Sequence, residues 1–227
     1  MTQNKKTCFL LGGGKSLSAH IEAGLWEAIK DKDVWSLNFA YKFMPFLPTR
    51  QCWVDGSFFR KNLSDLQNLS SQGVPLYCKK SELYHAFPFF NQCATVRETN
   101  KVTAESLFIG TMGLVGVFAL SLAIKENYER IYLFGYDFGT KSQFDEKTHF
   151  YSDKVKEMNI QSSGVGHPGV YYSGNNIKQS VNEFDYFNQF NKEIYNVSTI
   201  SNINSYPKLS YTEFLDFIEQ TNLTKQT

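Results

Sequence analysis

The sequence predicts an α/β fold built on a mostly parallel β-sheet. Short apolar runs recur along the chain with loops or amphipathic segments between them, which is the pattern of βαβ units. Glycine-rich or polar turns directly follow several of these runs. Of the 227 residues, 42% are hydrophobic and 20% are charged, so the chain can fill a core and lacks the composition of a disordered protein.

Six segments are expected to form the strands. Each is short, apolar and bounded by turn residues, as buried strands are. They are residues 7–11, 34–37, 51–54, 74–78, 130–134 and 194–197.

Helices are expected where apolar residues recur at helical spacing. After the first strand, Leu17, Ile21, Leu25 and Ile29 share one face of a single helix over residues 17–30, and Ser16 can cap its N-terminus. Similar spacing predicts helices over residues 112–126, 179–192 and 211–220.

Residues 139–176 interrupt this alternation. They mix glycine, histidine, tyrosine and charged residues without periodicity. A long aperiodic insertion in a compact domain is either disordered or a functional lid, and the histidine and aromatic content favours the lid. We therefore expect one domain over residues 1–227, with a lid after the fifth strand.

Composition disfavours several classes of protein. The formal net charge is +1, whereas a duplex nucleic-acid binder normally carries a basic surplus. The longest apolar stretch, residues 114–124, is shorter than the roughly 20 residues of a transmembrane helix. The N-terminus leaves no room for a signal peptide, and the four cysteines form no CxxC pair. These features predict a cytoplasmic protein with reduced cysteines and no transmembrane segment.

The candidate binding residues follow the strands. In an open parallel sheet, ligands bind beyond the carboxyl ends of the strands, near the point where strand order reverses. The residues at those positions are Gly12, Gly13, Gly14, Lys15 and Ser16 after the first strand, Asn38 after the second, Asp55 after the third, Asp137 after the fifth, and the turn Gly110, Thr111 and Gly113 before a helix.

The GGGKS turn favours an anion or nucleotide site, because a glycine-rich turn before a helix presents backbone N–H groups and a positive dipole. It is neither a Walker A loop, which needs glycine at Phe9, nor a GxGxxG fingerprint, which needs glycine at Leu17. A tight structural turn is the alternative. Asn38 and Asp55 have the same alternative, as turn or capping residues.

Two histidines in the expected lid could supply a general base. A neutral imidazole is the side chain best suited to accept a proton near neutral pH, and both His149 and His167 lie in this segment. Loop histidines without a chemical role remain the alternative. The DxD sequence at Asp31 and Asp33 precedes its strand and should fall on the opposite edge of the sheet, so metal chemistry has little support.

Taken in order, four segments resemble a known family. LLGGGKSL, LNFAYK, WVDGSFF and RIYLFGYDF resemble the bacterial sialyltransferases of glycosyltransferase family 42, which use CMP-sialic acid. They are also similar to a wider group of bacterial and phage Rossmann-like proteins related to archaeal hydroxymethylpterin pyrophosphokinases. The resemblance covers residues 7–138.

The resemblance implies a Rossmann-like three-layer fold and metal-independent transfer of a sugar from a CMP-sugar to a glycan hydroxyl, with no further cofactor. It places the nucleotide on Gly12 and Gly14, with Asn38 and Asp55 toward the donor. The turn Gly110, Thr111 and Gly113 then lies with Asp137 near the base and ribose. Asp55 stands where the family usually has asparagine.

The resemblance further implies a general base in the lid. His167, in GVGH, matches the family's glycine-preceded histidine better than His149 does, and Tyr151, Tyr171 or Tyr172 would stabilise the leaving phosphate. The family's tyrosine after the fifth strand is replaced by Gly139. The alternatives are a pyrophosphokinase-like phosphoryl transferase using ATP and Mg²⁺, and a non-catalytic nucleotide-binding module.

Overall fold

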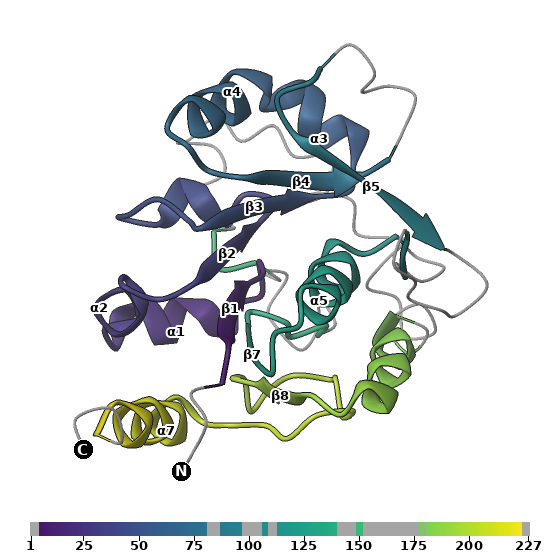
Figure 1. The fold of residues 1–227 in the computed structure, drawn as a ribbon. Coiled ribbons are helices and arrows are strands. Elements are labelled where there is room, and N and C mark those ends of the chain that lie inside the picture. Colours follow the sequence, from purple (N-terminus) through teal and green to yellow (C-terminus); the bar gives the residue numbers. More distant parts are fainter. Residues whose placement is uncertain are drawn as a thin grey trace.

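The protein is built on an eight-stranded, all-parallel sheet with the order β6-β5-β4-β3-β2-β1-β7-β8 (Figure 1). The structure, a computed structural model, describes residues 5–80, 87–96, 106–108, 113–139, 149–151, 178 and 180–223. The strands are β1 Thr7–Leu11, β2 Val34–Leu37, β3 Arg50–Trp53, β4 Leu76–Lys79, β5 Asn91–Val96, β6 Ser106–Phe108, β7 Arg130–Phe134 and β8 Glu193–Asn196.

The predicted α/β fold class is confirmed, and each of the six expected strands forms within two residues of its expected bounds. Strands β5 and β6 were not expected. The β5 sequence, NQCATV, mixes polar and apolar residues, and β6 is only three residues long. Neither shows the apolar run that marks the buried strands.

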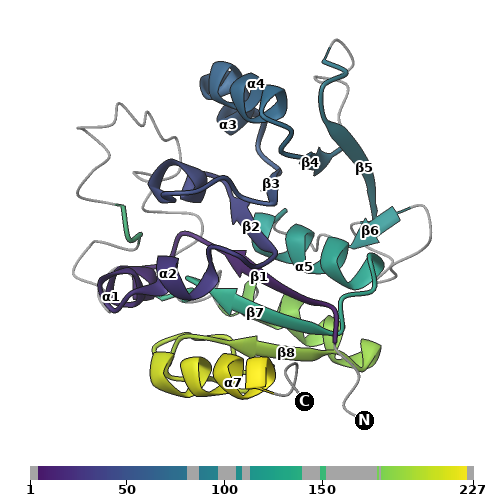
Figure 2. The ribbon, with the colours of Figure 1, turned by 60° about the vertical axis from the view of Figure 1, so that its left-hand side comes forward.

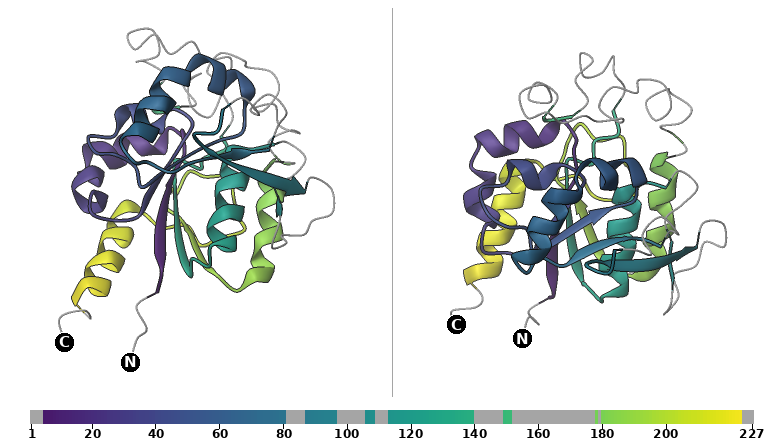
Figure 3. Two further views of the ribbon diagram at one scale, coloured as in Figure 1. Left: turned by 45° about the horizontal axis from the view of Figure 1, so that its top comes forward. Right: turned by 90° about the horizontal axis from the view of Figure 1, so that it is seen from above.

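Helices cover both faces of the sheet, and Figure 3 shows α1 and α7 on the opposite side from α5 and η4. The helices are α1 Ser16–Glu22, α2 Leu25–Ile29, η1 Ala40–Phe43, α3 Gly56–Lys61, α4 Leu63–Ser71, α5 Val115–Lys125, η4 Glu183–Phe190 and α7 Tyr211–Leu223. Alternation along β1 divides the core between these layers. Phe9 and Leu11 pack in the cluster of α1, α2 and α7, whereas Cys8 and Leu10 pack with α5 and η4.

One helix prediction was wrong. Residues 17–30 form two helices, because Gly24 adopts a left-handed conformation with φ 92° and ends the first helix after Glu22. Ser16 does not cap α1 either. It lies inside the helix, after Lys15 at the N-cap position, and its hydroxyl donates a hydrogen bond to Asp137.

The strand order reverses beside β1. From β1 the chain adds strands outward to β6, and α5 then leads back to β7 on the other side of β1 (Figure 2). The carboxyl ends of β1 and β7 therefore flank the position where open α/β sheets bind ligands.

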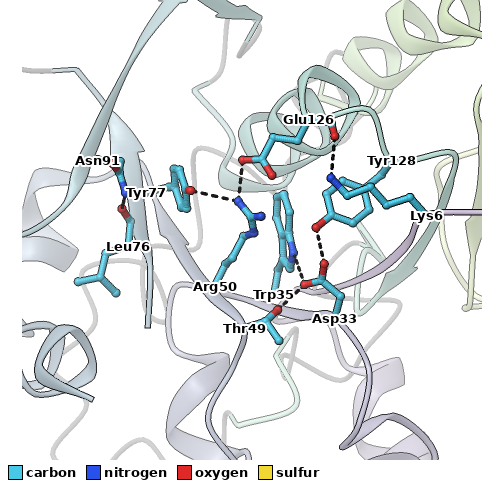
Figure 4. Close-up of polar contacts among 10 residues, drawn as sticks. All are labelled: Lys6, Asp33, Trp35, Thr49, Arg50, Leu76, Tyr77, Asn91, Glu126 and Tyr128. Atoms are coloured by element: carbon cyan, nitrogen blue, oxygen red, sulfur yellow. Dashed lines mark hydrogen bonds and ion pairs between the residues drawn. The ribbon is translucent and has the colours of Figure 1, made fainter. Parts of the chain in front are cut away.

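A network of polar side chains lies at the opposite edge of the sheet (Figure 4). Asp33 accepts hydrogen bonds from the Trp35 indole, the Thr49 hydroxyl and the Tyr128 hydroxyl. The DxD aspartate thus lies on the edge away from the candidate site, as expected, and holds three neighbouring segments together.

Arg50 forms the second half of this network (Figure 4). Its guanidinium lies 4.6 Å from the centre of the Trp35 ring and 5.3 Å from that of Tyr77. It also donates to Glu126 Oε1 at 2.6 Å and to Tyr77 Oη at 3.1 Å. The arginine therefore ties β3 to the C-terminal end of α5.

None of the four cysteines, all of which lie in the described ranges, forms a disulfide bond. Cys8, Cys52 and Cys78 are buried and Cys93 is half-buried. Burial raises the pKa of the Cys93 thiol, which keeps it protonated near neutral pH. In the part of the chain that the structure describes, no helix has both the length and the apolar character needed to cross a membrane.

Candidate functional site

The glycine turn after β1 is held directly against the end of β7. The Gly12 amide donates to the Phe134 carbonyl at 2.7 Å, and the Gly14 amide donates to the Gly135 carbonyl at 2.8 Å. A Cβ atom on Gly12 would lie 2.7 Å from the Gly135 oxygen, closer than side chains approach a backbone. Glycine at this position is therefore required by the approach of the two strands.

Asp137 occupies the N-terminal end of α1. Its carboxylate accepts hydrogen bonds from the Ser16 amide at 2.7 Å, the Ser16 hydroxyl at 2.6 Å and the Ser198 hydroxyl at 2.8 Å. Only 2% of the residue is exposed. This carboxylate therefore supplies the negative charge that the helix end favours, and its hydrogen bonds give Asp137 a role in holding the turn.

Ser198 is a site residue that the sequence reasoning missed. It follows β8, on the far side of β7, and is almost fully buried. The rule that polar residues at the carboxyl ends of strands share one edge could have found it, because Ser198 follows the sixth expected strand as Asp137 follows the fifth.

Residues 149–151 lie on the glycine turn. His149 pairs with Gly14 in an antiparallel bridge, and the Phe150 amide donates to the Gly13 carbonyl at 3.1 Å. A Cβ atom on Gly13 would lie 2.9 Å from His149 Cδ2 and 3.1 Å from Tyr151 Oη. The structure thus brings two candidate catalytic side chains, His149 and Tyr151, to the candidate binding turn.

Aromatic packing holds this segment in place. The Tyr151 ring stacks on Phe43 of η1, with centroids 5.4 Å apart, and meets the edge of Phe39 at 5.9 Å. Only 4% of Tyr151 is exposed. Residues 149–151 are therefore anchored to the segment that follows β2.

Burial also determines the protonation state of His149. Because the surrounding protein disfavours the charged imidazole, the pKa of His149 falls to about 4. The side chain is neutral at neutral pH, so it can accept or donate a hydrogen bond at the turn. A base with so low a pKa is a weak proton acceptor.

Asn38 follows β2 at the same edge and has a left-handed backbone, with φ 50°. Its amide donates to the Cys52 carbonyl at 3.0 Å, and its own carbonyl accepts from Gln51 Nε2 at 3.0 Å. Its side-chain Oδ1 is buried without a hydrogen-bond partner among the described residues. Asparagine adopts left-handed conformations more readily than most residues, which explains the residue type at this turn.

Asp55 lies beyond the end of β3, at the N-cap position of α3. Its side chain makes no capping hydrogen bond, and the residue is exposed. The pKa of its carboxyl lies above the ordinary value, because partial burial raises it more than nearby Lys79 lowers it. The carboxylate therefore faces solvent at the same edge of the sheet.

The remaining candidates differ in how far the structure describes them. Lys15 is half-buried at the start of α1, and Gly113 lies in the turn before α5 with φ 64°. Four others lie outside the described residues: Gly110, Thr111, His167 and Tyr171. Tyr172 lies outside them as well.

Comparison of the chain with protein-family models and with curated proteins finds no match. Within the described ranges, no three or more histidine, cysteine, aspartate or glutamate side chains are grouped so that they could hold a metal ion. The candidate site is therefore described by its geometry alone. It consists of the glycine turn, Asp137 at the start of the following helix, and His149 and Tyr151 packed on the turn.

Proposed function

We propose that the protein binds a nucleotide-sugar at the carboxyl edge of β1, β2, β3 and β7 and transfers the sugar to a hydroxyl of a glycan acceptor. The donor class is a CMP-linked sugar, as the resemblance to sialyltransferases implies, and the reaction needs no metal. We place this activity in the cytoplasm, where the free cysteines remain reduced.

The placement of His149 and Tyr151 on Gly13 supports this proposal most strongly. The turn lies where the strand order reverses, which is the usual ligand position of this fold. Gly13 has no side chain between the turn and the two rings, so polar groups from distant segments converge on one small area. Convergent polar side chains at such a position are typical of a binding site.

The charges favour a CMP-linked donor over ATP. The Asp137 carboxylate already occupies the end of α1, and Asp55 places a second carboxylate at the same edge. Each repels phosphate groups, so a donor with one phosphodiester charge is accommodated more easily than a triphosphate.

In the proposed reaction, the acceptor hydroxyl gives its proton to the imidazole of His167. The hydroxyl oxygen bonds to the anomeric carbon as the bond from that carbon to the phosphate breaks, and CMP departs with the electron pair. Tyr151 donates a hydrogen bond to the departing phosphate. His149, neutral because of its low pKa, serves as a hydrogen-bonding group at the turn.

Thermal shift measurements with CMP, UDP, GDP and ATP, each with and without Mg²⁺, test the binding step. A nucleotide at 100 times its dissociation constant stabilises the folded state by about 2.7 kcal/mol. We expect CMP to stabilise without Mg²⁺. Stabilisation by ATP only with Mg²⁺ would favour a phosphoryl transferase instead, and no response to any nucleotide would refute the proposal.

Release of CMP from CMP-sialic acid tests the chemical step. Tyr151→Phe keeps the stacking on Phe43 and removes only the hydroxyl, so we expect slower CMP release with nearly unchanged CMP affinity. His167→Ala should lower turnover by roughly 100-fold to 10,000-fold. Wild-type binding of CMP without any release of CMP from the donor would indicate a non-catalytic nucleotide-binding protein.

A further inference from the structure

Two polar side chains, Ser36 and Gln51, lie side by side in the interior of the sheet. They are paired in the register of β2 and β3, and both are 0% exposed. Their neighbours two residues away on the same strands, Val34 and Trp53, are core residues. A polar pair at the centre of a sheet covered by helices needs a hydrogen-bonding explanation.

The orientation of the Gln51 carboxamide is fixed by its nitrogen. Nε2 donates to the carbonyl of Asn38 at 3.0 Å and to that of Cys52 at 3.2 Å. Both partners can only accept, so this end of the side chain must be the NH₂ group. Oε1 is therefore the other end, and it is buried with no hydrogen-bond partner among the described residues.

Two further side-chain oxygens in this region are buried without a hydrogen-bond partner in the described part of the chain. They are Ser36 Oγ and Asn38 Oδ1. Ser36 is the register partner of Gln51, and Asn38 is bonded to Gln51 through its carbonyl. Three neighbouring residues therefore each contain a buried oxygen with unused hydrogen-bonding capacity.

We propose that an ordered water molecule binds between Ser36 Oγ and Gln51 Oε1, and that Gln51 is a positioning residue for Asn38. Water suits the chemistry. It can accept from the Ser36 hydroxyl and donate to the Gln51 carboxamide oxygen, and buried waters make about two to four such bonds. Complete burial of Ser36 and Gln51 favours this small occupant over part of a larger ligand.

The site links the sheet interior to the candidate binding edge. Gln51 donates to the Asn38 carbonyl, and the water fixes the other end of the same carboxamide, so both restrain a residue whose backbone is in the left-handed region. The positioning role rests on the proposed function, because it matters only if Asn38 contacts a ligand. The water site itself does not depend on the proposed function.

The water site is tested without any ligand. Ser36→Ala removes the hydroxyl with little change in volume. If the hydroxyl bonds to water, we expect the melting temperature to fall by about 2 to 4 °C. An unchanged or higher melting temperature would show that the hydroxyl was unbonded and would overturn the site. A crystal structure provides a direct check, with solvent density between Ser36 Oγ and Gln51 Oε1 expected and its absence contradictory.

The positioning role is tested by CMP affinity in a double-mutant cycle. We expect Gln51→Met to weaken CMP binding about tenfold, which corresponds to a loss of about 1.4 kcal/mol in binding free energy. In an Asn38→Ala background, the same substitution should have little further effect, because it acts through Asn38. Additive effects would overturn the positioning role. If the wild-type protein bound no CMP, the proposed function would fail, while Ser36→Ala and the crystal structure would still decide the water site.

Discussion

The carboxylate of Asp137 lies 2.7 Å from the backbone nitrogen of Ser16 and accepts its hydrogen bond at the first turn of α1. The two residues are 121 positions apart in the chain. The bond fastens the helix that follows the glycine turn to the end of β7. The geometry of the candidate site therefore depends on a buried charge behind the turn.

Replacing Asp137 by asparagine should destabilise the protein. The amide that replaces one carboxylate oxygen cannot accept a hydrogen bond, and the charge that favours the start of α1 is lost. Bonds to charged groups contribute about 1.5 to 3 kcal/mol each, so we expect the free energy of unfolding in urea to fall by about 2 to 4 kcal/mol. Asp216→Asn, at an exposed position of α7, is the control, and equal effects of the two substitutions would contradict a special role for Asp137.

Two glycine substitutions in the turn should separate stability from binding. Gly12→Ala places a Cβ against the Gly135 backbone, which cannot move cheaply, so we expect a loss of about 1 to 3 kcal/mol in unfolding free energy. Gly13→Ala meets only the ends of the His149 and Tyr151 side chains. These contacts are with side chains and not with backbone, so Gly13→Ala should cost less stability than Gly12→Ala and weaken CMP binding more for each kcal/mol of stability lost. The arrangement would be contradicted if denaturation showed a larger loss of unfolding free energy in Gly13→Ala than in Gly12→Ala, or if calorimetry showed a smaller loss of CMP affinity relative to that loss.

His149 should make stability depend on pH in the acid range. Its pKa is about 4 in the folded protein, below the ordinary value of 6.5. Between these values the unfolded chain binds a proton that the folded protein does not, so stability falls as pH decreases from about 6.5 to 4, by up to about 3 kcal/mol. His149→Gln should reduce this decrease, as measured by urea unfolding at pH 7 and pH 4.5.

A second buried histidine provides the comparison. Burial also lowers the pKa of His20, so part of the pH dependence should remain in His149→Gln. NMR titration of the wild-type imidazoles gives an independent measurement. A His149 pKa above 6 would show that the ring is more hydrated than its position on the turn implies.

The Arg50–Glu126 pair at the opposite edge should contribute to stability without affecting the site. Both side chains are largely buried, and the pair lies among the Trp35 and Tyr77 rings. In a double-mutant cycle of Arg50→Met and Glu126→Gln, we expect a coupling energy of about 1 to 2 kcal/mol. The exposed pair of Lys30 and Glu27 should give a smaller coupling energy. CMP affinity should not change, and a large loss would show that the two edges communicate.

Local sequence predicted the central strands because they are buried on both faces and therefore mostly apolar. It did not predict β5, whose first residue, Asn91, is exposed and whose sequence includes polar residues. It also predicted one helix where Gly24 divides two, because spacing of four residues continues across the break. The spacing of apolar residues does not show that Gly24 takes a left-handed backbone between the two helices.

The sequence placed the candidate residues together at one edge of the sheet, where the structure has the described ones, but it did not indicate the bonds formed there. Asp137 was expected near a ligand, yet its oxygens bond to Ser16 and Ser198. Such partnerships join residues far apart in sequence, and no local pattern encodes them. Position after a strand indicates where a side chain lies, whereas its hydrogen-bond partners depend on which strands become neighbours.

The place of β1 in the sheet also bears on how the chain folds. β1 is the first strand in the sequence, yet it pairs with β2 on one side and with β7 on the other. The pairing with β7 closes a very long loop, and contacts of high sequence separation slow folding. During synthesis, β1 to β4 can assemble while one side of β1 still lacks its partner. The exposed side of β1 is then a site for mispairing with another chain, and we expect refolding yields to decrease as protein concentration increases.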